Sequence, residues 1–64
     1  MRLTEFWRLV HEEFGEMRGD SLARDQVFSS LQGRSAREAL EAGTEPKVVW
    51  LAICDAYDVP VKRR

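Results

Sequence analysis

The stretch GTEPKVVWLAI, residues 43–53, decides the fold of this chain because it marks where one helix ends and the most apolar helix begins. Gly43 can adopt the left-handed conformation that closes a helix. Thr44 can cap the helix that follows, and Pro46 suits a first helical turn, where its missing N–H would lack an acceptor anyway. Apolar residues then cover most of the circumference of a helix predicted over about 45–57. Such a helix is expected in the centre of a bundle.

Helical spacing also organises the beginning of the chain. A first helix is predicted to start after Thr4 and to end at Gly15 or Gly19. Its apolar residues recur at three- and four-residue steps and define one core face: Leu3, Phe6, Trp7, Val10, Phe14 and Met17.

Two shorter helices are predicted in the middle. The first opens at Asp20-Ser21 and stops at Gly33. The second opens with the capping box Ser35-Ala36-Arg37-Glu38 and runs through Ala42, with Leu40 as its main anchor. The segment 59–61 is expected to be extended, because Pro60 disfavours helix at the residue before it.

Length and composition bound the fold class. Sixty-four residues make one domain, and 44% hydrophobic residues with two Trp, three Phe and one Tyr suffice for a compact core. We therefore expect an all-α fold, a compact bundle of four short helices over residues 1–64 with the C-terminal helix central. The short basic tail 62–64 is expected to be solvated.

Charge and cysteine usage exclude several classes of protein. Ten Lys and Arg against eleven Asp and Glu leave a net charge of −1, which provides no global attraction to nucleic acid or anionic lipid. The single cysteine excludes an internal disulfide and fits a reducing compartment. No secretory signal and no membrane-spanning apolar run is visible, so we expect a cytoplasmic protein that is neither exported nor embedded in a membrane.

No residue pattern indicates catalysis, a metal or a cofactor. A helical zinc motif around His11 would need a second histidine where Gly15 stands. Cys54 lies in the apolar helix, where burial raises the pKa of a thiol and makes it inert. Acid pairs such as Glu12 and Glu16 fall on an exposed face that provides no difference in pKa between them. We expect no enzyme.

Three residues break the helical pattern and are the candidates for a protein-interaction surface. Arg24 projects among the apolar positions of the second predicted helix, so it either forms a structural ion pair, with Asp20 or an acid of another helix, or anchors a partner. Leu9 and Leu51 fall on polar arcs of the first and fourth helices. Together they would form an apolar patch if these helices are neighbours.

A helix-turn-helix element over residues 36–57 is the alternative interpretation. Its second helix offers only Lys47 toward phosphates and lacks the Arg, Asn or Gln that read base edges, so specific nucleic-acid binding is not expected. Weak contact with nucleic acid would use the basic residues in and around this element: Arg34, Arg37, Lys47, Lys62, Arg63 and Arg64.

Short motifs along the chain point to a known family. They are MRLTEFW at 1–7, ARD at 23–25, LQGRS at 31–35, EAL at 38–40, Gly43, PK at 46–47, VW at 49–50, Cys54 and VP at 59–60. Together they resemble an actinobacterial family known as domain of unknown function 3046, over nearly the whole chain. The resemblance implies a cytoplasmic bacterial protein without an assigned activity, so no site residue is carried over. Members are often encoded near the recombinase RecA and its regulator RecX, which hints at DNA repair.

These observations together predict a protein-interaction module, monomeric or weakly dimeric, that binds another protein as an adaptor or regulator. An association with DNA recombination or repair is what the family resemblance adds. The alternative is an accessory DNA-binding domain of helix-turn-helix type. A DNA-binding domain should show a basic face, whereas an adaptor should show an apolar patch with a polar rim.

Overall fold

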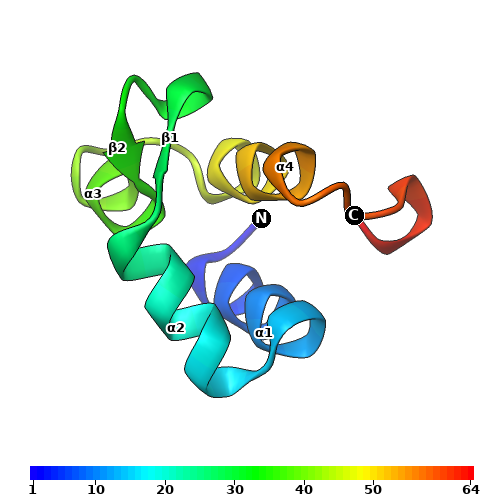
Figure 1. The fold of residues 1–64 in the computed structure, drawn as a ribbon. Coiled ribbons are helices and arrows are strands. Elements are labelled where there is room, and N and C mark those ends of the chain that lie inside the picture. The colour runs from blue at the N-terminus through cyan, green and yellow to red at the C-terminus, as the bar shows by residue number, and fades with distance from the viewer.

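The computed structural model describes all 64 residues and contains four helices and one two-stranded sheet (Figure 1). The elements follow in the order α1 (Leu3–Phe14), α2 (Glu16–Asp25), β1 (Val27–Phe28), β2 (Arg34–Ser35), α3 (Ala36–Glu41) and α4 (Pro46–Ala56), with 3-10 turns at Ser29–Leu31 and Val61–Arg63. The predicted all-α class with four helices is therefore confirmed, and the small sheet is an addition to it. No helix has the length and apolar character that crossing a membrane requires.

The C-terminal helix α4 lies at the centre of the core, as predicted. It packs against α1, α3 and β1, and Trp50 is only 1% exposed while Val49, Ile53 and Cys54 are fully buried. A single cluster of buried apolar residues joins α4 to every other helix. This burial follows from the many apolar residues of the helix, although Val48 and Leu51 remain exposed on its outer face.

The turn before α4 uses its residues differently from the prediction. Gly43 is left-handed with φ 94°, as expected. Thr44 does not cap α4, because the N-cap position is occupied by Glu45. The N–H of Thr44 donates to Ala39 O at 2.9 Å, and that of Gly43 donates to Leu40 O at 3.1 Å. These two bonds form the Schellman arrangement that closes α3. The residue before α4 is Glu45, which makes no side-chain cap, and Pro46 is the first helical residue.

The first two helices meet at Gly15, whose φ of 86° ends α1 and lets α2 begin at the next residue. Phe6 and Val10 form the buried face of α1. Met17, predicted on the same face, is 88% exposed because the chain has turned into α2 before reaching it. Leu3 is half exposed as well.

The predicted second helix over 20–33 is wrong. Helix α2 ends at Asp25, and the following residues form an antiparallel hairpin in which Val27 pairs with Ser35 and Phe28 with Arg34. Gln32 and Gly33 close this hairpin with φ of 61° and 76°. The β-favouring pair Val27-Phe28 and the left-handed turn thus outweighed the four-residue apolar spacing on which the prediction rested.

Gly19 is a contact point between helices and not a helix end. It is buried inside α2, and a Cβ atom placed on it would lie 2.9 Å from Val10 Cγ1. Only glycine therefore lets α2 approach α1 this closely.

The capping box of α3 is present as predicted. Ser35 Oγ accepts from Glu38 N at 3.1 Å, and Glu38 Oε1 accepts from Ser35 N at 2.9 Å. The anchoring differs from the prediction, because Ala36 and Ala39 are the buried residues of this helix and Leu40 is only partly buried.

The C-terminal residues are not a free tail. Val59 is buried, and a 3-10 turn over Val61–Arg63 begins at the last residue of the segment 59–61 that was expected to be extended. The indole N–H of Trp50 donates to Arg64 O at 3.4 Å. Arg63 reaches Glu13 of α1 with two bonds of 3.0 and 3.1 Å, and Arg64 contacts Asp55 at 2.6 Å. A left-handed Asp58 redirects the chain and makes this return possible.

Candidate binding surface

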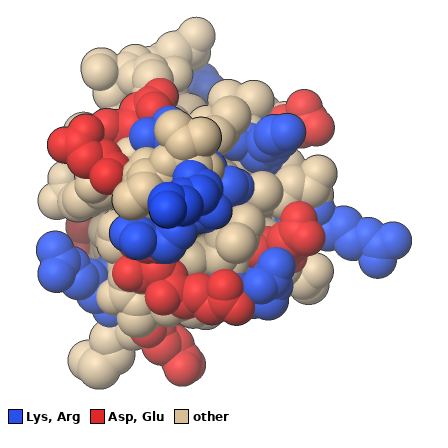
Figure 2. All heavy atoms as spheres, turned by 90° about the vertical axis from the view of Figure 1, so that its right-hand side faces the viewer, with Lys and Arg blue, Asp and Glu red and all other residues tan.

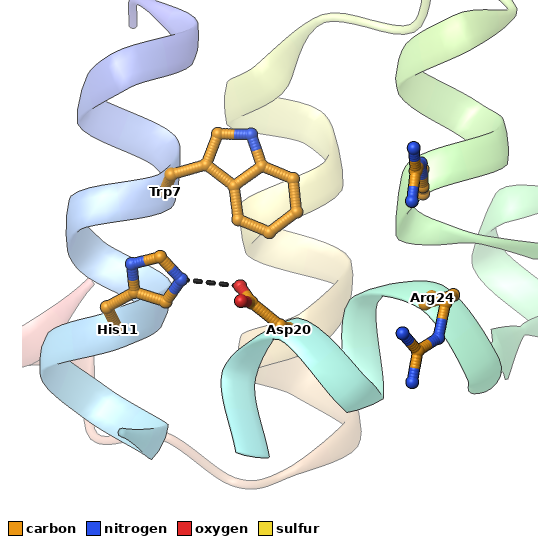
Figure 3. A pocket seen from close by; sticks show the side chains of 5 residues that line it. Trp7, His11, Asp20 and Arg24 are labelled. Atoms are coloured by element: carbon orange, nitrogen blue, oxygen red, sulfur yellow. Dashed lines mark hydrogen bonds and ion pairs between the residues drawn. The ribbon is translucent and has the colours of Figure 1, made fainter. Parts of the chain in front are cut away.

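Three helices enclose a surface hollow of about 460 Å³, which we call the three-helix hollow. It is lined by Trp7 and His11 of α1, Asp20 and Arg24 of α2, and Arg37 of α3. Figure 3 shows Trp7, His11 and Asp20 gathered together, with Arg24 farther along α2. All five side chains are polar or amphipathic, so this is a polar hollow on the surface and not a cavity in the core.

Local spacing brings these side chains together. Trp7 and His11 stand one turn apart on α1, and Asp20 and Arg24 stand one turn apart on α2, so each pair shares a helix face. The close approach of the two helices at Gly19 sets these faces beside each other. Arg37 joins them from the first turn of α3, just after the Ser35 cap.

One side of the hollow is held in place by aromatic and ionic contacts. His11 Nε2 lies 2.6 Å from Asp20 Oδ1 (Figure 3). The Trp7 ring packs edge-on to Phe6 at 5.1 Å and lies 5.9 Å from the His11 ring. Trp7 is thus fixed against the core, yet its indole N–H, unlike that of Trp50, has no acceptor within the protein.

The two arginines are held loosely. Arg24 Nε lies 3.3 Å from its neighbour Asp25, and Arg37 Nε lies 3.9 Å from Glu41. Both arginine side chains are 63% exposed. Ion pairs of this kind contribute only about 0–1 kcal/mol, so either guanidinium can exchange its partner at little cost.

Arg24 does not lie on the apolar arc that its spacing in the sequence predicts. Because α2 ends at Asp25, Phe28 and Leu31 are not on the helix of Arg24. An ion pair does form, but with Asp25 and not with Asp20 or another helix.

The structure does not bring the three candidate interaction residues to one place. Arg24 lines the three-helix hollow, whereas Leu9 lines a separate hollow with Glu12, Glu13 and Arg63. Leu9 is also partly buried and packs against the core, so it is not the freely exposed leucine that its polar arc indicated. Leu51 is 37% exposed on α4 and lines neither hollow. Helices α1 and α4 are neighbours, but the two leucines share no concave surface.

The basic residues of the DNA-binding alternative are also dispersed. Arg34 lies on β2, Arg37 on α3 and Lys47 in the first turn of α4, while Lys62, Arg63 and Arg64 lie at the C-terminal turn. Three of them are in ion pairs: Arg37, Arg63 and Arg64. Figure 2 looks onto the side where the C-terminal turn lies and shows acidic and basic groups interleaved there. That side carries no continuous basic face.

Cys54 is buried in α4, as its sequence position indicated. Burial raises the pKa of its thiol to about 11, with the opposing charge of Arg64 lowering it and the charges of Asp55 and Glu13 raising it further. The thiol is therefore protonated at neutral pH and has the character of a core side chain.

A family model describes almost the whole chain. It is called "Protein of unknown function (DUF3046)", and its match covers residues 1–62. The chain belongs to this family. The resemblance found in the sequence motifs is thereby confirmed, and so is the actinobacterial character that it implied.

One relative of this DUF3046 domain is a longer protein of Mycobacterium tuberculosis. Its name is "Putative envelope-preserving system protein Rv2742c", and it is 47% identical over 36 residues, which are 56% of this chain. The chain spans only 13% of that protein's length. No solved structure matches the chain.

Three residues that line the hollow were not among the candidates from the sequence: His11, Asp20 and Trp7. Trp7 shows why. It was assigned wholly to the core face of the first helix, whereas its ring is shared between the core and the hollow. A signal was present, because Trp7 and His11 stand one turn apart at the border of the apolar stripe. Without the position of α2 and α3, this spacing could not be distinguished from packing.

Proposed function

We propose that this domain is a protein-interaction module that binds a partner through the three-helix hollow. One observation carries the proposal: a fixed tryptophan with an unused indole N–H faces two loosely paired arginines from two other helices. Tryptophan and arginine are the residue types that most often dominate the binding energy of protein interfaces. The fold gains little from Arg24 or Arg37, because both side chains are 63% exposed and form only weak ion pairs.

The mycobacterial relative is much longer than the segment that resembles this chain, and this difference in length supports a role as a module. The similar segment is a small part of a much longer chain there, as expected for a unit that serves a larger assembly. The name of that protein refers to an envelope-preserving system, and the family resemblance pointed to DNA repair. We propose a cytoplasmic adaptor or regulator whose partner belongs to one of these two settings.

Capture experiments with matched variants test this proposal. The wild-type domain and the double variant Arg24→Gln/Arg37→Gln would be used as bait in lysate of the actinobacterium that encodes it. Arg18→Gln serves as control, because Arg18 is exposed on the same helix and lies outside the three-helix hollow. We expect the double variant to lose a protein that the wild type and the control both retain. Equal capture by all three baits would contradict the proposal.

DNA binding is the second candidate function, favoured by the succession of α3, a glycine turn and α4 over residues 36–57. Against it, α4 buries most of its circumference and presents only Lys47 as a basic residue. We expect duplex DNA at about 150 mM salt to bind no tighter than the micromolar range of non-specific contact. A nanomolar, sequence-dependent constant in a fluorescence titration would make DNA binding the better proposal.

A further inference from the structure

We infer that the three-helix hollow recognises an acidic side chain next to an apolar one in a segment of the partner protein. This inference rests on the proposed function and specifies the chemistry of the partner. It follows from what the lining residues offer: two guanidinium groups, one indole and one carboxylate already paired to a histidine.

The two arginines supply the affinity for a carboxylate. Arg24 donates to Asp25 from Nε at 3.3 Å, and Arg37 Nε lies 3.9 Å from Glu41 without a hydrogen bond, so the terminal nitrogens of neither arginine donate a hydrogen bond within the protein. A guanidinium binds a carboxylate best through two parallel N–H bonds, which neither existing pair uses. An incoming carboxylate can therefore form better bonds than those it replaces.

Trp7 supplies the contact with an apolar neighbour. Phe6 and His11 fix its ring on two sides, and its remaining surface faces the hollow. An indole offers an apolar face and one N–H donor, and this donor has no acceptor within the protein. A segment with an apolar side chain on the ring could thus place a carboxylate or a backbone carbonyl near the indole N–H.

Asp20 and the net charge disfavour a polyphosphate chain as the occupant. The Asp20 carboxylate lies in the hollow with its side chain 58% exposed, so successive phosphates would bring negative charge against it. The whole chain carries a net charge of −1 and provides no long-range attraction for a polyanion. A single carboxylate brings one negative charge into the hollow, where two arginines face one aspartate.

The volume of the three-helix hollow also suits a few side chains of a partner protein. At about 460 Å³, the hollow is at the lower end of the roughly 300–1,000 Å³ that ligand sites occupy. It is open to solvent, so it suits part of a polypeptide and not an enclosed small molecule. We therefore assign it to a short acidic and apolar segment.

Peptide titrations test this assignment. The probe is acetyl-Leu-Glu-Leu-Glu-Leu-amide, and the control is the same peptide with both glutamates replaced by glutamine. Heteronuclear NMR would follow the indole N–H signals of Trp7 and Trp50 and the Nε–H signals of Arg24 and Arg37. We expect the acidic peptide to shift the Trp7, Arg24 and Arg37 signals together and to bind about tenfold more tightly than its glutamine control. The Trp50 signal should not move, because that N–H is already bonded to Arg64 O.

Variants and free anions complete the test. The double variant Arg24→Gln/Arg37→Gln should lose the preference for the acidic peptide, and Arg18→Gln should retain it. Sodium acetate and sodium phosphate show whether a lone anion suffices, and we expect both to bind more weakly than the peptide. Equal binding of the two peptides, no binding of either, or tighter binding of phosphate than of the acidic peptide would overturn the inference.

Failure of this inference can be distinguished from failure of the proposed function. If the acidic peptide does not bind but lysate capture still depends on Arg24 and Arg37, the hollow is an interaction surface of another chemistry. If capture does not depend on these arginines, the proposed function fails, whatever the peptide does.

Discussion

Two pairs of arginines in this domain are held in opposite ways. At the C-terminal end, Arg63 makes two bonds to Glu13, and Arg64 donates to Asp55 at 2.6 Å and to Val59 O at 2.8 Å. In the three-helix hollow, Arg24 and Arg37 each make one long contact to an acid on the same helix. The first pair connects α1 and α4 through the C-terminal turn and adds to the fold. The second pair adds little to the fold, and it is the pair that we propose to bind a partner.

The largest expected effect concerns the core beneath the C-terminal turn, where the first pair of arginines is held. Trp50 is 1% exposed at the centre of α4 and bonds to the C-terminal turn. Trp50→Ala should cost roughly 3–5 kcal/mol, most of the stability of so small a domain, and leave it unfolded or nearly so. Urea melts would measure this loss. A loss under about 1 kcal/mol would show that α4 is not the element on which the core depends.

The buried thiol of Cys54, also on α4, should make the free energy of unfolding depend on pH. Its pKa is raised from 9.0 to about 11 in the folded protein, so above pH 9 the unfolded chain releases the proton first. Stability from this group is therefore complete below pH 9 and is lost as pH rises toward 11, by about 2–3 kcal/mol. Melts of the wild type and of Cys54→Ala should show their difference in stability shrinking across this range. A constant difference would contradict the burial of the thiol.

The third prediction concerns the helix contact beneath the hollow. Gly19→Ala would place a Cβ 2.9 Å from Val10 Cγ1 and force α1 and α2 apart, so we expect a loss of about 1–3 kcal/mol. Arg18→Ala is the matched control, because it changes an exposed neighbour on the same helix. Thermal or urea melts should separate the two. If Gly19→Ala is as stable as the wild type, the two faces that form the hollow are not held by this contact.

A direct comparison of the arginines should show a smaller effect. Arg64→Ala removes the bonds to Asp55 and Val59 O and should cost about 1 kcal/mol. Arg24→Ala should stay within about 0.5 kcal/mol of the wild type, because it removes only an exposed pair. Equal losses in urea melts would abolish the distinction between fixed and loosely held arginines.

The smallest expected effect is on the outer face of α4. Leu51 is partly exposed and lines neither the three-helix hollow nor the one beside Leu9. Leu51→Lys should change the stability by no more than about 0.5 kcal/mol. If this variant also abolishes partner capture while Arg24→Gln/Arg37→Gln does not, the interaction surface lies on α4 and not in the hollow.

The structural features that the sequence predicts correctly are those that depend on residues close together in the chain. The capping box at Ser35 and Glu38, the left-handed Gly43 and the first-turn Pro46 were predicted correctly, because each depends on residues a few positions apart. The hairpin at 27–35 was missed, because its two strands are short and four-residue apolar spacing resembles a helix. Helix type and number could be predicted, and Gly15 was one of the two predicted ends of the first helix, while the start of α2 at Glu16 and its end at Asp25 could not be predicted.

The sequence by itself determined that α4 is central, that Cys54 belongs to the core and that no strong overall charge draws the chain to nucleic acid. Each of these depends on composition or on periodicity within one element. Only the tertiary structure decided that Trp7, Arg24 and Arg37 line one hollow and that Arg63 and Arg64 return to the body of the protein. These features require contacts between residues far apart in the chain, and their positions follow from how closely whole helices can approach one another.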